Sequence, residues 1–300
     1  MSDDGGGGTG APQSPGDAFA LLGNEYRAEI IRTLGDAHGT EGPRPVLAFS
    51  ELYDRADVDI ATSQFNYHLQ KLVGPFLEGT DEGYRLRHGA VELYRTILAG
   101  TYIRDASLEP FPVGADCHYC EAPIEARYDD RRLVIGCSAC DREYSDTTAP
   151  PSIGDGDRDA LLARIDQYLR HRILAFSKGA CSICANGLDT RLLPGEELAG
   201  AGANQLDVFV HRSCDHCGAQ QYMSVGLALL YDVDLVSFFN NRGLDVTETP
   251  IWELEFAMTD RHVDTVATEP TRLALRVERG GDELELVVDG DLTVVERSTP

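Results

Sequence analysis

The cysteines of this chain are the residues whose type and spacing most directly indicate chemistry. All 8 cysteines of the 300-residue chain fall into Cys-x-x-Cys pairs. Two residues between thiolates let a tight turn direct both sulfurs at one ion, and two such turns complete a tetrahedral site of four thiolates. The predicted metal ligands are Cys117, Cys120, Cys137 and Cys140 at a first site and Cys181, Cys184, Cys214 and Cys217 at a second.

The two quartets resemble zinc ribbons, and we expect one structural Zn²⁺ in each. Four thiolates can also hold iron, so the residues leave zinc and iron open. Disulfides are not expected in a cytosolic chain, and the sequence lacks the thioredoxin-like pattern of a redox-active pair. Four sulfurs already complete each site, so the neighbouring histidines are expected not to bind the ion; these are His118, His211 and His216. A site closed by four thiolates has no open position for a substrate, which favours architecture or sensing over catalysis.

Short strands are expected to position these cysteine pairs. Residues 124–128 and 132–136 have the pattern of strands on either side of a turn at Asp129-Asp130, which predicts a hairpin in the first quartet. In the second quartet a strand leads into the pair at Cys214, and residues 185–205 are expected to form a long loop. The predicted modules are a first ribbon over 112–146, a linker over 147–157, a helix over 158–176, and a second ribbon with short helices over 177–248.

The composition predicts a globular protein adapted to salt. Hydrophobic residues make up 42% of the chain, and its net charge is −24, with Lys71 and Lys178 as its lysines. High acidity with so little lysine resembles proteins of extreme halophiles, which work in salt that screens charges within about 3 Å. Residues 1–16 are acidic and rich in glycine, so we expect a disordered tail and no secretory signal. No apolar run is long enough to span a membrane.

One segment of this acidic chain, from Ile60 to Leu77, contains no acidic residue. A helix is predicted there with Asp59 as its cap, and its apolar face consists of Ala61, Phe65, Leu69 and Leu72. The opposite face carries hydrogen-bonding side chains without a carboxylate: Ser63, Gln64, Asn66, Tyr67, Gln70 and Lys71. Amides and hydroxyls read base edges in the major groove of DNA, and an ammonium group binds phosphate. This face therefore predicts a helix that binds double-stranded DNA.

The neighbouring segments predict a small helical domain around this helix. A helix over 16–37 and a shorter one over 49–58 precede it, and a hairpin over 76–87 follows it. The hairpin would present Arg85 and Arg87 outward to the DNA backbone. A last helix over 90–103 carries an apolar stripe, which either covers the domain or, as we prefer, pairs with a second copy.

Together these segments resemble the ArsR-type winged helix-turn-helix repressors, over about residues 17–104. The version found in halophilic archaea is the most similar, through the recurrent helix pattern that is matched here by Phe65, Tyr67, His68, Leu69 and the KLV at 71–73. The resemblance implies a homodimeric DNA-binding regulator, which would be cytoplasmic and associated with the nucleoid. Metal-sensing members carry cysteines at or near their DNA-reading helices. This chain has no cysteine before Cys117, so metal sensing does not carry over.

The end of the chain is expected to form an antiparallel β-sheet over 249–298. Trp252, Leu254, Phe256 and Met258 alternate with other residues and predict a strand, and further strands flank Gly280-Gly281 and follow Gly290. The sheet would serve in ligand sensing, dimerisation or capping. The expected fold class is thus a multidomain α+β protein with an N-terminal winged helix-turn-helix, two zinc-ribbon modules and a C-terminal antiparallel sheet.

The charge distribution supports the DNA-binding prediction in part. Residues 19–104 hold 9 basic and 12 acidic residues, against 17 and 35 in residues 105–300. However, residues 167–188 are also free of acids and contain Arg170, Arg172 and Lys178. This second stretch is either an internal helix with a cysteine pair or a second contact to nucleic acid.

The sequence favours a transcription regulator over an enzyme. It contains no Gly-x-Ser-x-Gly, phosphate loop, dinucleotide glycine cluster or His-Glu-x-x-His, so we expect no catalytic residues. Two alternatives remain open: an adaptor whose ribbons bind protein partners, and a thiol- or metal-responsive sensor in which one quartet releases its ion. An effector is possible and its identity is unknown.

Overall fold

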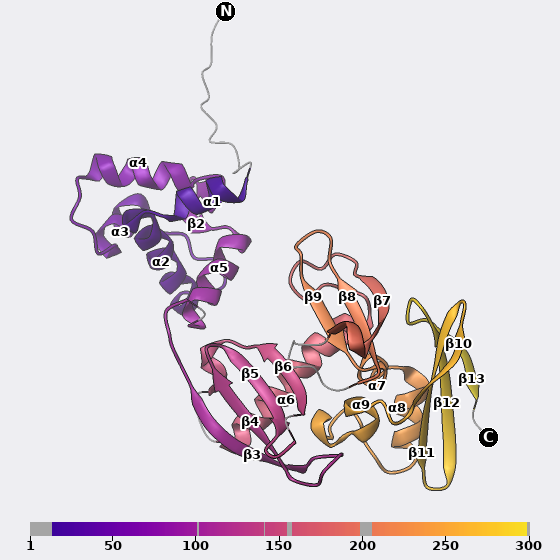
Figure 1. Ribbon diagram of the computed structural model, residues 1–300. Coiled ribbons are helices and arrows are strands. Elements are labelled where there is room, and N and C mark those ends of the chain that lie inside the picture. The colour runs from indigo at the N-terminus through magenta and orange to yellow at the C-terminus, as the bar shows by residue number, and fades with distance from the viewer. Residues whose placement is uncertain (1–13, 101, 141, 155–157, 199–205, 299–300) are drawn as a thin grey trace, which may run out of the picture. The chain divides into compact units, whose positions relative to one another are not determined.

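The computed structural model describes residues 14–100, 102–140, 142–154, 158–198 and 206–298 (Figure 1). The chain divides into two compact units, Met1–Arg104 and Asp105–Pro300. Across the described ranges it is a mixed α+β protein with nine α-helices and four antiparallel sheets, which confirms the predicted class. Of the expected disordered tail, residues 1–13 lie outside the described ranges. Residues 14–16 already belong to the capped start of a helix.

The described part of the first unit consists of helices and one hairpin. In chain order these are α1 (Pro15–Leu22), α2 (Glu25–Thr40), α3 (Phe49–Arg55), α4 (Thr62–Leu72), β1 (Leu77–Thr80), β2 (Gly83–Leu86) and α5 (His88–Leu98). The single helix expected over 16–37 is therefore wrong in one respect, because the helix is interrupted between α1 and α2. Asn24 is extended at the break, and its side chain accepts a hydrogen bond from the backbone N–H of Arg27, which starts a new helix.

The core of the first unit lies where α2, α3 and α4 meet the hairpin. Its fully buried side chains include Ile30, Leu34, Leu52, Phe65, Leu69, Leu72 and Leu77. The apolar face predicted for α4 is thus confirmed, apart from Ala61. Ala61 is exposed because it precedes the helix as its N-cap, in place of the expected Asp59. Burial of this face fixes α4 so that its polar face points to solvent.

A residue of the preceding loop pairs with the hairpin. Leu47 and Tyr84 exchange two backbone hydrogen bonds of 3.0 and 2.9 Å. Gly83 permits this approach, because its φ is +151° and a Cβ there would lie 2.1 Å from the carbonyl oxygen of Leu47. The hairpin is thereby anchored to the chain before α3.

Helix α5 is buried at its start and exposed at its end. Val91 and Tyr94 are buried, and a Cβ on Gly35 of α2 would lie 2.6 Å from the Tyr94 ring. The Tyr94 hydroxyl donates a hydrogen bond to the carboxylate of Asp36. At the end of the helix and just after it, three apolar side chains are exposed: Leu98, Tyr102 and Ile103. The predicted apolar stripe therefore covers its own unit first and then faces solvent.

The second unit begins with a four-stranded meander. Its strands lie side by side in chain order: β3 (Leu108–Asp116), β4 (Pro123–Asp129), β5 (Arg132–Cys137) and β6 (Glu143–Thr148). The hairpin expected over 124–136 is confirmed, with its turn at Asp130-Arg131, where both residues have positive φ. The linker expected over 147–157 is shorter than predicted. Strand β6 continues to Thr148 and a 3₁₀ turn, η1, spans Pro151–Gly154; residues 155–157 lie outside the described ranges.

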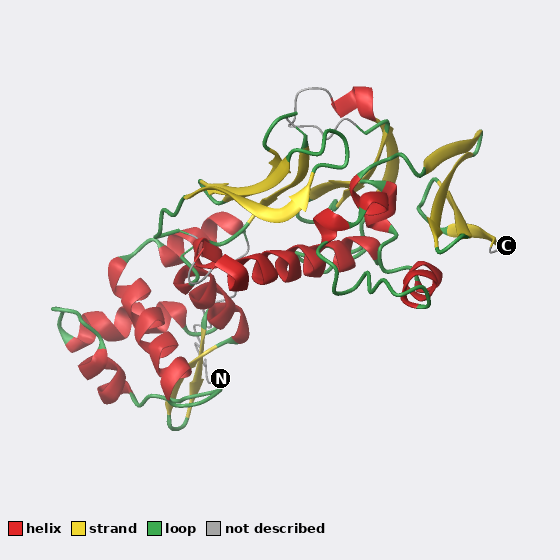
Figure 2. Cartoon of the chain, turned by 90° about the horizontal axis from the view of Figure 1, so that it is seen from below, coloured by secondary structure: helices red, strands yellow, loops and turns green. Residues whose placement is uncertain are grey.

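A long helix, α6 (Arg158–Ser177), lies along the meander and matches the predicted helix over 158–176 (Figure 2). Its buried side chains, Leu161, Ile165, Leu169 and Ile173, share one core with the strands. Asp166 and Arg170 form a buried ion pair of 2.5 Å within it. Among the described helices, none is long and apolar enough to cross a membrane.

A three-stranded sheet and two short helices follow α6. They comprise β7 (Asp189–Pro194), the 3₁₀ turn η2 (Gly195–Leu198), β8 (Val208–Ser213), β9 (Gln220–Met223), α7 (Val225–Ala228) and α8 (Val233–Asn240). The long loop expected over 185–205 is thus wrong for β7, which pairs with the whole length of β8. Pairing with a neighbour, which local sequence does not reveal, makes this segment a strand although half of its residues are exposed. Residues 199–205 lie outside the described ranges.

The last part of the chain differs from prediction at its start. The strand expected around Trp252 is wrong: a 3₁₀ turn, η3 (Ile251–Glu253), and a helical turn, α9 (Glu255–Met258), occupy that segment. Phe256, Ala257 and Met258 are buried in succession, whereas a one-sided strand buries alternate residues. The sheet that follows has the order β10 (Val263–Thr268), β11 (Thr271–Arg279), β12 (Asp282–Asp289) and β13 (Val294–Ser298). The predicted hairpin at Gly280-Gly281 is confirmed.

Candidate functional site

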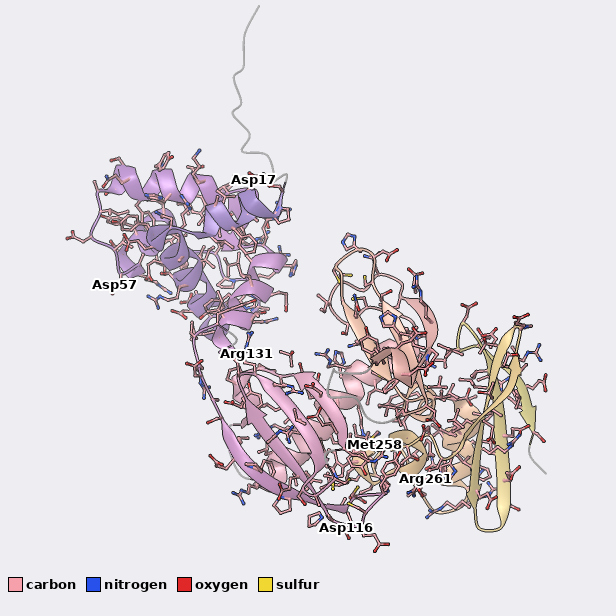
Figure 3. The ribbon with its side chains drawn as sticks, in the orientation of Figure 1. Asp17, Asp57, Asp116, Arg131, Met258 and Arg261 are labelled. Carbon is pink, nitrogen blue, oxygen red and sulfur yellow. The ribbon has the colours of Figure 1, made fainter. Side chains whose placement is uncertain are left out.

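The first cysteine quartet is a compact cluster of sulfur atoms. All four lie within 4.8 Å of one another, with Cys117 and Cys140 3.7 Å apart and Cys120 and Cys137 3.4 Å apart. These thiols are free, and the distances far exceed a disulfide bond of about 2.05 Å. A tetrahedral ion bound at about 2.3 Å would place its sulfurs about 3.8 Å apart. The cluster therefore fits one metal ion held by four thiolates; Figure 3 shows sulfur atoms gathered beside Asp116.

The second quartet has the same geometry. Its sulfurs also lie within 4.8 Å of one another, with Cys181 and Cys217 3.6 Å apart and Cys184 and Cys214 3.5 Å apart. Cys181 and Cys214 are buried, whereas Cys217 is exposed. Both predicted clusters are thus formed by residues that the sequence placed in the same quartet.

Three of the cysteine pairs share one backbone turn. The residue after the second cysteine has a positive φ in each, 61° at Glu121, 61° at Ala185 and 74° at Gly218. The backbone N–H of that residue donates to the carbonyl of the first cysteine at 3.0, 2.9 and 2.8 Å respectively. The turn keeps both sulfurs on one side, as a shared ion requires. Asp141, which follows the remaining pair, lies outside the described residues.

Hydrogen bonds favour the thiolate form of at least one cysteine in each cluster. Burial opposes ionisation of Cys117, but donation from the Tyr144 hydroxyl and from the backbone outweighs it and lowers the pKa of Cys117 to about 6. A backbone N–H at Asn186 is the main cause that lowers the pKa of Cys184 to about 6. Burial and the neighbouring Cys137 thiol raise the pKa of Cys140 to about 12. Each cluster therefore contains a thiol that ionises readily, and a bound cation would favour the thiolate form further.

The histidines near the clusters make contacts of their own. His118 Nε2 lies 2.9 Å from the carbonyl oxygen of Trp252, and the His211 ring stacks on Tyr222 with centroids 4.6 Å apart. His216 is exposed. Among the described residues, the two groups of potential metal ligands contain cysteine alone, as expected.

Sequence reasoning missed two residues that join the first cluster to the rest of its unit. The Tyr144 hydroxyl donates to the Cys117 sulfur at 3.1 Å, and no spacing rule for cysteine pairs identifies such a tyrosine. Two guanidinium groups contact the Tyr119 ring, with Arg142 at 3.4 Å and Arg261 at 4.6 Å from the ring centroid. Together with His118, Tyr119 thereby fastens the first cysteine turn to the segment around residues 252–261.

The polar face of α4 lies outward, as the sequence predicts. All six of its side chains are exposed, namely Ser63, Gln64, Asn66, Tyr67, Gln70 and Lys71. The Lys71 ammonium lies 5.5 Å from the Tyr67 ring, and no carboxylate among the described residues pairs with it. The Gln70 amide donates to the Tyr84 hydroxyl at 3.1 Å, which links this face to the hairpin.

The two hairpin arginines already have partners within the unit. Arg85 forms a two-point ion pair with Glu78 at 2.9 and 2.7 Å, and Arg44 reaches the same carboxylate at 3.4 Å. Hydrogen bonding from Arg85 holds the pKa of Glu78 below its usual value, with Arg44 and Arg87 adding to the effect. Arg87 is exposed and donates to the carbonyl of Gly74. The hairpin base thus gathers three guanidinium groups around one carboxylate.

The second acid-free stretch has an internal role at one of its arginines. Arg170 is buried, pairs with Asp166 and donates to the carbonyl of Val246 at 3.0 Å. Arg170 is therefore not available to nucleic acid. At this residue the structure favours the internal helix over the second nucleic-acid contact. Arg172 is half-buried, and Lys178 is exposed.

Two family models match parts of the chain, one in each unit. The chain belongs to the family described as a domain of unknown function, DUF7351, whose model matches residues 114–294. A second model, also described as a domain of unknown function, DUF7347, matches residues 15–97. No curated protein and no solved structure matches the chain.

Proposed function

We propose that this chain is a DNA-binding transcription regulator of the ArsR-like winged helix-turn-helix kind, with two structural zinc ions. In this proposal α3 and α4 form the helix-turn-helix, and the hairpin β1–β2 forms the wing. Helix α4 enters the major groove and reads base edges.

The observation that carries this proposal is the exposed face of α4. It offers amides, hydroxyls and one ammonium group to solvent without a carboxylate, in a chain with 50 acidic residues. A carboxylate on this face would lie against the phosphate backbone and oppose binding. Gln64, Asn66 and Gln70 have the side-chain chemistry that pairs with adenine, and Lys71 has the charge that pairs with phosphate.

The base of the hairpin is the part of the wing that fits a phosphate. Its three guanidinium groups outnumber the single carboxylate of Glu78, so a net positive charge remains there. The tip carries Asp81 and Glu82, which phosphate would repel. In this arrangement Arg87 contacts the DNA backbone. Arg85 contacts it only while it keeps its ion pair with Glu78.

The exposed end of α5 supports a homodimer. Leu98 is 59% and Tyr102 is 71% exposed, and a second copy would bury both. A two-fold dimer would present two α4 helices to two half-sites of DNA.

In this proposal the two metal clusters stabilise the fold of the second unit and take no part in catalysis. Four thiolates leave no position for a substrate, and Zn²⁺ suits such closed tetrahedral sites. We expect elemental analysis to find two zinc ions per chain, and iron in their place would overturn this assignment.

The DNA proposal is tested by binding in molar KCl. The DNA is taken from sites that the protein occupies in its own cells, and affinity is measured by fluorescence anisotropy. Gln64→Ala and Tyr67→Ala should each weaken binding about tenfold, because each removes a base contact. Asn241→Ala, just after α8, is the matched control, since it removes an exposed amide from the other unit. Equal affinity of all variants would favour the adaptor function instead.

A further inference from the structure

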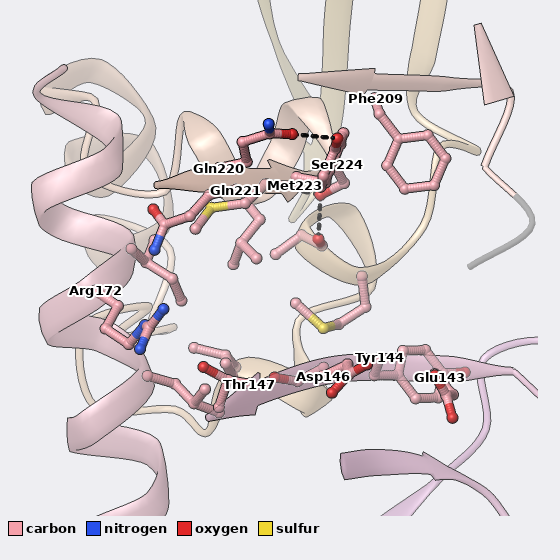
Figure 4. Close-up of a pocket in the computed structure, with 18 of the residues that line it drawn as sticks. Glu143, Tyr144, Asp146, Thr147, Arg172, Phe209, Gln220, Gln221, Met223 and Ser224 are labelled. Atoms are coloured by element: carbon pink, nitrogen blue, oxygen red, sulfur yellow. Dashed lines mark hydrogen bonds between the residues drawn. The ribbon is translucent and has the colours of Figure 1, made fainter. Parts of the chain in front are cut away.

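The second unit contains a cavity that neither the metal clusters nor the α4 face explains. Its volume is about 490 Å³, within the range of small-molecule sites, which runs from about 300 to 1,000 Å³. Strands β6 and β9, each at the edge of its sheet, line it together with α6 (Figure 4).

The charged groups of the cavity are unequally paired. Glu143 and Asp146 line it, but Arg132 reaches both at 3.4 and 2.7 Å, and Arg127 reaches Glu143 at 2.8 Å. These two acids are therefore matched by two guanidinium groups. Arg172 also lines the cavity, and none of the described carboxylates pairs with it. One positive charge thus remains uncompensated.

The surroundings of Arg172 leave it able to bind a ligand. Its guanidinium makes two long hydrogen bonds, to the carbonyl of Thr148 at 3.4 Å and to the Tyr168 hydroxyl at 3.5 Å. Figure 4 shows Arg172 and the amide of Gln221 pointing into the cavity from the same side. A planar guanidinium beside an amide donor is well suited to a carboxylate.

The cavity lining is polar and apolar in similar measure. Its apolar lining includes Leu169, Ile173, Phe209, Met223, Leu227 and Met258. Two flexible methionine side chains can adapt to different ligand shapes. A ligand that contacts both Arg172 and the apolar part of the lining would therefore combine an anionic head with an apolar body.

We propose that this cavity binds a small amphipathic carboxylate, with the Arg172 guanidinium and the Gln221 amide holding the carboxylate. The apolar wall takes the organic body of the ligand. Binding in this cavity does not depend on the DNA-binding function proposed above, and it is measured without DNA.

Both metal clusters border the strands that line this site. Strand β6 begins three residues after Cys140, and β9 begins three residues after Cys217. Ile251 of η3 also lines the cavity, and the neighbouring Trp252 carbonyl is bound by His118 of the first cysteine turn. Loss of the bound ions should therefore disturb the cavity as well.

The proposal is tested by calorimetric titration of the zinc-loaded full chain in molar KCl. The probes are 4-phenylbutyrate and its uncharged analogue 4-phenylbutanol. The carboxylate should bind about tenfold more tightly than the alcohol, because only the carboxylate forms charge-assisted hydrogen bonds with the Arg172 guanidinium. Arg172→Gln should remove this preference and Arg172→Lys should retain part of it. Arg158→Gln, at the start of the same helix and outside the cavity, should behave as the original chain.

Three results would overturn the proposal. These are no binding of 4-phenylbutyrate at millimolar concentration, equal binding of both probes, or a carboxylate preference that survives in Arg172→Gln. The comparison of the two probes on the unaltered chain decides the matter even if a variant fails to fold.

Discussion

At the scale of single residues, the buried ion pair of α6 shows how charge can serve the fold and not a ligand. Asp166 accepts the backbone N–H of Ile251 at 3.0 Å, while Arg170 donates to Val246 and pairs with Asp166. The pair therefore fastens the segment from Val246 to Ile251 onto α6. Burying either charged group without its partner would cost several kcal/mol, on the order found for other buried ions.

Arg170→Met should consequently destabilise the second unit by about 3–5 kcal/mol, because it leaves the Asp166 carboxylate buried and unpaired. The measurement is urea unfolding followed by the fluorescence of Trp252, the only tryptophan of the chain. Adding Asp166→Asn should recover part of the loss. A stability of Arg170→Met close to that of the original chain would show that Asp166 is solvated.

Tyr94 gives the first unit a pH-dependent contribution. Burial and the hydrogen bond to Asp36 raise the pKa of Tyr94 to about 12 from an ordinary value of 10. Because the folded state holds the proton more tightly, the contribution is complete below about pH 10 and is lost as pH rises through about 12. Its size is on the order of 2 kcal/mol.

Tyr94→Phe should therefore flatten the loss of stability between about pH 10 and about pH 12. Urea midpoints of both proteins are followed by circular dichroism at the helical band. Other tyrosines titrate in both proteins, so the difference between the two curves isolates Tyr94. Parallel curves would mean that its hydroxyl is not protected in the folded chain.

At the scale of elements, local patterns predict those parts whose residues determine their own conformation. The hairpin at Gly280-Gly281 and the buried face of α4 follow from turn residues and from a clear period. The cysteine clusters follow because ligand type and spacing are set by the ion.

The errors arise where a distant neighbour decides the conformation. Residues 251–258 are enclosed on several sides. Their buried positions therefore follow neither the two-residue period of a strand nor the 3.6-residue period of a helix. Gly226 shows this enclosure, because a Cβ there would lie 1.8 Å from the Phe256 carbonyl oxygen. The sequence likewise gives no sign of the cavity around Arg172, since β9 lies far along the chain from β6 and α6.

The hairpin offers a test of one element's anchor. Gly83→Ala would force a Cβ against the Leu47 carbonyl and should destabilise the first unit by at least about 1–3 kcal/mol. Gly79→Ala is the matched control, because its Cβ would meet nothing closer than 3.9 Å. Urea unfolding followed by circular dichroism measures both. Equal stability of the two variants would contradict the close approach of Leu47 to β2.

At the scale of the whole molecule, the metal ligands and the single tryptophan belong to one unit, Asp105–Pro300. The unit Met1–Arg104 contains no cysteine. An ion that binds the folded unit but not the unfolded chain stabilises that unit by mass action. Its removal must therefore act on the second unit first.

Treatment with a chelator should lower the urea midpoint reported by Trp252 fluorescence. His118 supplies a direct route, because it binds the Trp252 carbonyl from within the first cysteine turn. Cys120→Ser and Cys217→Ser each change an exposed cysteine, one in each cluster. Each variant should lose one ion per chain, which elemental analysis measures. Cys120→Ser should have the larger effect on the tryptophan signal, since the first cluster contacts that segment directly. An unchanged urea midpoint after complete removal of both ions would mean that the clusters do not stabilise the fold. The sensor function would then explain the eight cysteines better than a structural role.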